Sequence, residues 1–164
     1  TIHCKIPLEA FSTLCLELGK RYNSAVLAVE DEGHGKVVLN IARAQGYPNI
    51  YRRRQNLAVG KWATAPYGWH TDRATRPLMI ADLDMYIRDG TAITYDERLI
   101  NETLGLVYNP SRGSDWGLEA PEGGHDDLFM AWCIFCQIRS AIPTRRIQTA
   151  ATDAGRRVVH YAPY

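Results

Sequence analysis

The sequence Ala25-Val26-Leu27-Ala28-Val29, followed directly by Glu30-Asp31-Glu32, decides the fold. An uninterrupted apolar run of this length predicts a strand whose two faces are both buried, as in parallel sheets. A turn flanked by Gly33 and Gly35 leads into a segment of helical periodicity, and Ile50-Tyr51 then has the composition of a short strand. Strand, helix and strand in this order predict a parallel βαβ unit.

The rest of the chain alternates between helical and strand periodicity, which predicts an α/β domain. The expected helices are residues 7–19, a second one that stops at Gly46, a third capped by Thr71 or Thr75 that ends at Gly90, residues 96–104 with Asp96 as cap, and residues 124 to about 142. Strands are expected at residues 2–5 and 93–95, and a hairpin at residues 106–108 and 118–120. For residues 52–68 we expect a hairpin or a long loop.

Length and charge limit the classes of function. The 164 residues fit a single domain with one sizeable core. The formal net charge of +1 excludes binding of nucleic acid through a uniformly basic surface, so any DNA-binding surface has to be local. The longest apolar run, residues 128–136, is far shorter than the roughly 20 residues of a membrane span, so we expect no transmembrane segment and no membrane partner.

The four cysteines, Cys4, Cys15, Cys133 and Cys136, lie in apolar-patterned segments without a secretory signal ahead of them. We therefore expect reduced thiols in a cytoplasmic protein. Cys133 and Cys136 form a Cys-x-x-Cys motif, but no second Cys pair or His pair lies at zinc-finger spacing. The motif is therefore expected to pack in the core.

Two acidic clusters carry the candidate chemistry: Glu30 to Glu32 after the strand, and Asp126-Asp127 at the start of the last helix. Hydrolysis of a phosphodiester by two metal ions needs carboxylates from separate elements, because Mg²⁺ and Mn²⁺ prefer oxygen ligands. Each cluster also has a structural interpretation, since aspartate favours helix starts and a glutamate at a strand end can be solvated. His125 and, more weakly, His34 can likewise be ligands or satisfy local hydrogen bonds.

Several segments occur in a specific order between residues 7 and 139. They are Tyr22-Asn23-Ser24-Ala25, Val29-Glu30, Gly35, Gly46-Tyr47-Pro48-Asn49-Ile50-Tyr51, Gly68-Trp69-His70-Thr71, Thr75-Arg76, Leu99-Ile100-Asn101-Glu102, Ala120-Pro121-Glu122-Gly123-Gly124-His125-Asp126-Asp127 and Met130-Ala131. This ordered set resembles the C-terminal nuclease domain of the tailed-phage terminase large subunit, the motor that cuts concatemeric viral DNA during packaging.

The resemblance implies a ribonuclease-H-like mixed sheet flanked by helices and a metal-dependent endonuclease that cuts double-stranded DNA with Mg²⁺ or Mn²⁺. It also implies an upstream packaging ATPase domain in the parent chain, the portal protein and the small terminase subunit as partners, and the cytoplasm of a bacterial host as the location. No phosphate-binding Gly-x-x-x-x-Gly-Lys-Ser/Thr motif occurs here, so the ATPase lies outside this sequence. Residues 1–142 are expected to form the nuclease domain, truncated at its N-terminus, and residues 143–164 a basic tail.

Carried over by residue, Glu30 matches the strand-end metal ligand of the family, and Asp126 and Asp127 match the acidic pair that opens its last helix. All three are therefore expected to be catalytic metal ligands that face one another across a cleft. The family's remaining aspartate lies on the first sheet strand, upstream of Thr1. Glu32-Gly33 also departs from the asparagines usual after the family's glutamate, which affects only the local turn.

The expected DNA contacts are Lys61, Arg73 and Arg76, because Lys and Arg bind the phosphate backbone; solvated surface side chains are the alternative. Two other functions stay open: a non-catalytic terminase-derived module for docking or DNA binding, and a resolvase-like or integrase-like nuclease acting on branched DNA. Without its first strand, the sheet is expected to leave unpaired edges beside residues 25–29, which favours self-association. We also expect weak Mg²⁺ or Mn²⁺ binding and poor activity of this chain alone.

Overall fold

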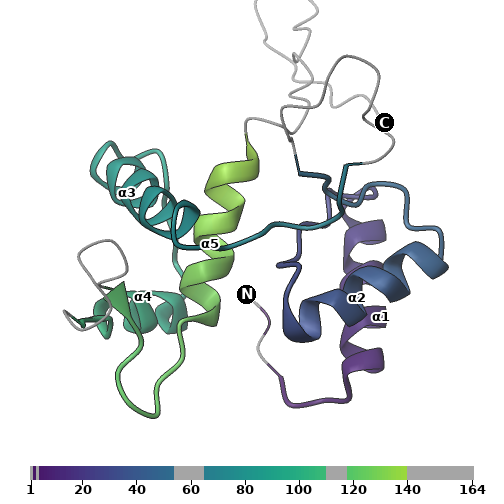
Figure 1. Ribbon diagram of the computed structural model, residues 1–164, viewed down its shortest axis with the longest axis horizontal. Helices are drawn as coiled ribbons and strands as arrows, with labels where there is room; N and C mark the ends of the chain where they lie inside the picture. Colours follow the sequence, from purple (N-terminus) through teal and green to yellow (C-terminus); the bar gives the residue numbers. More distant parts are fainter. Residues whose placement is uncertain (1, 3, 54–64, 110–117, 140–164) are drawn as a thin grey trace, which may run out of the picture.

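The computed structural model describes residues 2, 4–53, 65–109 and 118–139 (Figure 1). These residues form an α/β structure with five helices and a two-stranded antiparallel sheet. The helices are α1 (Leu8–Arg21), α2 (Gly33–Ala44), α3 (Thr75–Arg88), α4 (Glu97–Leu104) and α5 (Asp127–Ile138), and the strands are β1 (Val107–Tyr108) and β2 (Leu118–Glu119). The predicted α/β class is confirmed. Lys61, the helix end near residue 142 and the tail from residue 143 lie outside the described residues.

Three extended segments form the centre of the molecule. Leu27 pairs with Ile50 and Glu30 pairs with Trp69, both in parallel, while Arg52 pairs with Tyr67 in antiparallel. The Leu27 amide donates to the Asn49 carbonyl at 2.8 Å, and the Trp69 amide donates to the Val29 carbonyl at 2.8 Å. The segments on either side of α2 thus pair in parallel, as the predicted βαβ order requires, but through isolated bridges and not as extended strands. The antiparallel bridge shows that the ends of residues 52–68 approach as in a hairpin.

One edge of the segment at residues 25–31 is paired and the other is not. The backbone groups of Leu27, Val29 and Asp31 point to one side, where they bond to residues 49–51 and to Trp69. The backbone groups of Val26 and Ala28 point to the opposite side, and none of them bonds to another backbone group among the described residues. Within the described ranges, the expected unpaired edge is therefore present on one side only, because Ile50 and Trp69 occupy the other.

The side chains of this segment belong to two different cores, as its continuous apolar run predicts. Val26 and Ala28 pack against the cluster formed by α3 and α5, whereas Leu27 packs against the cluster formed by α1 and α2. The first cluster contains Met79, Leu83, Phe129, Met130, Cys133, Ile134, Cys136 and Ile138. The second contains Leu16, Ala42 and Tyr47. In Figure 1, α1 and α2 lie on one side of the central segments, and α3 and α5 lie on the other.

Two of the predicted helix boundaries at glycines are wrong. Gly19 does not end the first helix, which continues to Arg21. A Cβ atom at Gly19 would overlap the buried side chain of Tyr47, whose hydroxyl donates to the Ala25 carbonyl at 2.6 Å. Gly33, expected in a turn, is the first residue of α2. Gly19 therefore allows close tertiary packing, and Gly33 allows the chain to enter α2. Neither glycine marks the end of a helix or a turn.

Gly35 sits in the first turn of α2, where a Cβ atom would overlap the carbonyl oxygen of Glu30. Gly68 has φ +88°, and a Cβ there would lie 2.8 Å from the carbonyl oxygen of Val29. Both glycines let neighbouring backbone approach the end of the central segment. They therefore fix the position of the segment that carries Glu30.

Local signals identified some other elements correctly and missed others. Asp96 caps α4 as predicted, since its carboxylate accepts from the amides of Arg98 and Leu99. The hairpin is confirmed by the pairing of β1 with β2. At the start of α3, the Asp72 carboxylate accepts from the amides of residues 74 and 75, and the Thr75 hydroxyl accepts from the Asp72 amide at 2.8 Å. Thr75 thus takes part in the cap as expected, whereas the role of Asp72 was not expected.

The predicted strands at residues 2–5 and 93–95 are wrong. Residues 2, 4 and 5 join no strand in the described part of the chain, and neither do residues 93–95. The side chains of Ile93 and Tyr95 are 66% and 91% exposed. A strand-like composition does not form a strand without a partner that satisfies the backbone groups.

Candidate functional site

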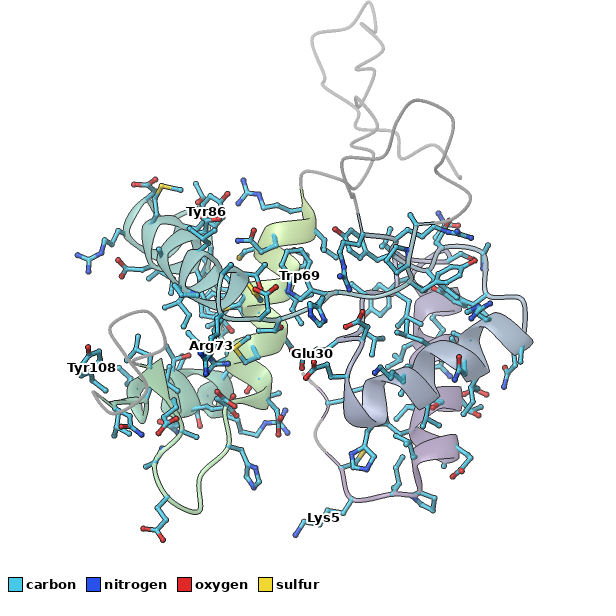
Figure 2. All side chains as sticks on the ribbon, in the orientation of Figure 1. Lys5, Glu30, Trp69, Arg73, Tyr86 and Tyr108 are labelled. Carbon is cyan, nitrogen blue, oxygen red and sulfur yellow. The ribbon has the colours of Figure 1, made fainter. Side chains whose placement is uncertain are left out.

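Glu30 ends the central segment, and its pairing with Trp69 fixes its backbone. Because side chains alternate along an extended segment, Glu30 shares the face of Val26 and Ala28, which pack on the α3 and α5 cluster. The side chain is half-buried. In the view of Figure 2, Glu30 lies between its own segment and α5. The strand end thus presents a carboxylate on the side of the helix that begins with the acidic pair.

Asp126 occupies the N-cap position of α5, but its side chain does not cap the helix. Its Oδ2 accepts a hydrogen bond from Nη2 of Arg76 on α3 at 2.6 Å, and their side chains are 27% and 12% exposed. The same Nη2 donates to the carbonyl of Leu118 at 3.0 Å. Arg76, expected as a DNA contact, is thus held in a largely buried ion pair that orients Asp126.

The cap of α5 comes from another helix. Oε1 of Glu102 on α4 accepts from the amide of Phe129 at 2.6 Å, which satisfies one of the free amides of the first turn. Glu102 belongs to the segment Leu99-Ile100-Asn101-Glu102, but the local sequence did not indicate this role, because Glu102 and Phe129 lie far apart along the chain. The contact fixes the end of α5 that carries Asp126 and Asp127.

Asp127 has a different environment from Asp126. Its side chain is 87% exposed and lies 3.8 Å from Nδ1 of His125, which is itself 73% exposed. Asp127 and His125 line a hollow of about 710 Å³ together with Glu102 and His34. Apolar side chains of the N-terminal segment, α1 and α5 form the rest of its wall. The hollow therefore combines histidine and carboxylate side chains from three helices and one loop.

Asp31, the second residue of the strand-end cluster, has a structural role. Its Oδ1 lies 2.8 Å from Nδ1 of His70, and its Oδ2 pairs with Arg53. Glu32 occupies the N-cap position of α2 without a side-chain capping bond and is exposed. Alternation along the segment separates Glu30 from Asp31, and Glu32 already belongs to the start of α2.

The described residues do not by themselves make a cation site. Among them, no three His, Cys, Asp or Glu side chains are grouped as metal ligands. The structure places Glu30 and Asp126 on adjoining elements, with Arg76 as the ion-pair partner of Asp126. The assignment of Glu30, Asp126 and Asp127 as metal ligands therefore stays a prediction.

No family model, curated protein or solved structure matches this chain. Function must therefore be argued from the residues themselves. In the part of the chain that the structure describes, no helix has the length and apolar character needed to cross a bilayer.

The Cys-x-x-Cys motif packs as predicted. Cys133 and Cys136 are 0% and 3% exposed in the cluster of α3 and α5. Burial raises the pKa of the Cys133 thiol to about 12 and also raises that of Cys136. Since metals bind the thiolate, a thiol held protonated by burial is a poor ligand.

Of the expected DNA contacts, Arg73 lies exposed in the loop before α3, where Figure 2 labels it. A second group of basic side chains, which sequence reasoning missed, surrounds a hollow of about 560 Å³ beside Asp31. Its lining residues are Asp31, Lys36, Leu39, Asn40, Arg43, Arg52, Ala65, Pro66 and Tyr67. The spacing of Lys36, Asn40 and Arg43 on one helix face was the available signal.

Proposed function

We propose that this chain is a nuclease domain of the terminase large-subunit type, which cuts double-stranded DNA with the help of Mg²⁺ or Mn²⁺. One observation carries the proposal: the segment before α2, which pairs in parallel with the segment after it, ends in Glu30 on the face packed against α5 and α3, and Asp126 and Asp127 stand at the start of α5. Carboxylates from a strand end and from the start of a helix on the same face are the kind of ligand set that divalent-metal nucleases need.

The carboxylates among the described residues are too few to hold two metal ions by themselves. The unpaired edge of residues 26–28 offers a place for one more strand beside Glu30. A strand added there could bring a further carboxylate to the same side of the molecule. The ordered sequence motif supports the same assignment, since the family has an additional aspartate on a neighbouring strand.

The residues of this chain have distinct proposed roles. Glu30 and the exposed Asp127 are the groups available to a cation. Arg76 positions Asp126, and Glu102 positions the start of α5. We treat Arg76 and Glu102 as positioning residues, because each acts through a group of the candidate site.

The test is cleavage of supercoiled plasmid by the full-length natural polypeptide with Mn²⁺, and with EDTA as the blank. We compare Glu30→Gln and Asp127→Asn with a matched control, Glu17→Gln, on an exposed position of α1. Both site variants should lose cleavage at least tenfold, while the control cuts like the unmodified protein. If Glu30→Gln and Asp127→Asn cut normally, the proposed site is wrong.

The second candidate is a non-catalytic module that docks or binds DNA. The ion pair of Arg76 with Asp126 favours it, because that carboxylate already has a cationic partner. DNA binding without Mn²⁺-dependent cleavage by the full-length protein would support this alternative. A preference for branched over linear duplex would instead support a resolvase-like enzyme.

A further inference from the structure

The basic hollow beside Asp31 lies between α2 and the segments around Arg52 and Tyr67. Lys36, Asn40 and Arg43 are four and three residues apart, so they lie along one face of α2. Arg52 and Tyr67, which pair in antiparallel, form the facing wall. Three cationic side chains from two elements therefore surround one concave surface.

Tyr67 organises two of these cations. The guanidinium carbons of Arg43 and Arg52 lie 4.9 Å and 4.0 Å from the centroid of its ring. Arg52 also donates a hydrogen bond to the Tyr67 hydroxyl. Guanidinium groups held over an aromatic ring lose less conformational entropy when they bind an anion. The arrangement is thus pre-organised for a negatively charged ligand.

The charges that line the hollow do not balance. Asp31 is its one acidic residue among the described positions, and its two oxygens are engaged by Arg53 and His70. Lys36 and Arg43 form no ion pair with any described residue. Like charges that converge on a concave surface raise the local positive potential and attract anions.

The shape favours an extended ligand over a single small anion. A second hollow, of about 600 Å³, adjoins the first and shares Asn40, Arg43 and Tyr67 with it. Arginine supplies a planar fork and lysine a point charge, and both suit phosphate oxygens. The surface starts beside Asp31, at the same end of the central segment as Glu30.

We propose that this surface, formed by Lys36, Asn40, Arg43, Arg52 and Tyr67, binds phosphates of the DNA backbone. The inference deepens the proposed function and rests on DNA being the substrate. The inference assigns binding of the DNA phosphates to α2 and to the segment around Tyr67. Arg76 is not part of this surface, because its guanidinium is paired with Asp126. Contacts of this kind position DNA without reading its sequence.

The test is binding of a fluorescent duplex by the full-length protein in EDTA, measured by anisotropy over a series of salt concentrations. The variant combines Lys36→Gln with Arg43→Gln, and the matched control combines Lys20→Gln with Arg88→Gln, two exposed cations elsewhere. Each lost phosphate contact lowers the slope of log K against log salt by about 0.9, so the variant should lose about 1.8. The same relation corresponds to roughly 60-fold weaker binding at about 0.1 M salt. The control should change the slope by less than half as much.

If the variant binds DNA with the same slope of log K against log salt as the unmodified protein, the inference is overturned. The proposed nuclease function is not affected by that result, because cleavage is assayed separately with Mn²⁺. A parallel titration uses inorganic phosphate alone. If the variant loses phosphate binding but keeps its DNA affinity, the hollow serves a small phosphate compound and the DNA assignment is overturned. Matching circular dichroism melts of variant and control show that a lost slope does not arise from unfolding.

Discussion

Replacing Arg76 by methionine tests how the start of α5 is held. Methionine keeps much of the apolar stem but removes the charge that meets Asp126 at 2.6 Å and the hydrogen bond to the Leu118 carbonyl at 3.0 Å. Removal of one partner of a fully buried pair costs about 3–5 kcal/mol. Since Arg76 is 12% and Asp126 27% exposed, water recovers part of that cost, and we expect a loss of about 2–3 kcal/mol.

The loss is measured by thermal unfolding followed by circular dichroism. For a chain of this size, about 1 kcal/mol shifts the Tm by roughly 2–4 °C, so Arg76→Met should lower it by about 4–12 °C. The matched control is Arg88→Met, because Arg88 pairs with Asp84 at 2.8 Å but with 76% and 58% of the two side chains exposed. An exposed pair contributes little to stability because water screens it, so the control should lose at most a few degrees.

A double-mutant cycle with Asp126→Asn separates the ion pair from the other contacts of Arg76. If the two changes are coupled through the pair, the combined variant loses less stability than the sum of the single changes. If Arg76→Met and Arg88→Met have the same Tm, the ion pair of Arg76 with Asp126 does not stabilise the start of α5, and the proposed role of Arg76 is wrong.

Three further predictions concern local packing and ionisation. Gly19→Ala should lower the Tm, because overlap with Tyr47 costs more than the roughly 1 kcal/mol that alanine gains within a helix; an unchanged or higher Tm would contradict the close approach. The hydrogen bond from Arg98 and the amides at the start of α4 lower the pKa of Asp96 to about 2. The charged carboxylate therefore stabilises the fold fully above the pKa of unfolded aspartate, about 4, and this stabilisation is lost as the pH falls through 2. Asp96→Asn should therefore flatten the Tm profile between about pH 4 and pH 2 in thermal melts, and an unchanged profile would argue against this charge. At neutral pH, iodoacetamide should label the exposed Cys4 while Cys133, with its pKa raised to about 12 by burial, reacts only on unfolding; mass spectrometry that finds equal labelling would contradict the buried thiol.

The elements that could be predicted from the sequence are those with a strong local cause. The apolar run at residues 25–29 predicted contacts on both faces, and Val26, Ala28 and Leu27 are half-buried against the two clusters, although Ala25 is exposed. The order of this run with a helix and Ile50 predicted parallel pairing. Asp96 identified the start of α4, because a capping carboxylate acts on amides two and three residues away. These inferences depend on neighbours in sequence or on simple topology.

The elements that were missed depend on residues far apart in the chain. Gly19 follows the rule for a helix end, yet its reason is the Tyr47 ring. The pairing of Arg76 with Asp126 joins α3 to the start of α5, and no spacing along the sequence shows it. Such contacts need the tertiary structure, which is why the fold class was predictable and the partner of each site carboxylate was not.

The side chains of residues 26–28 contact two different helical clusters, and this affects how the protein unfolds. No close backbone contact joins α1 or α2 to α3 or α5 within the described residues, so the central segments form the common wall of the two helical layers. Loss of that wall exposes both layers to water at once, which couples them thermodynamically. We therefore expect that a substitution at Leu27 and one at Val26, which weaken different layers, both shift a single cooperative transition.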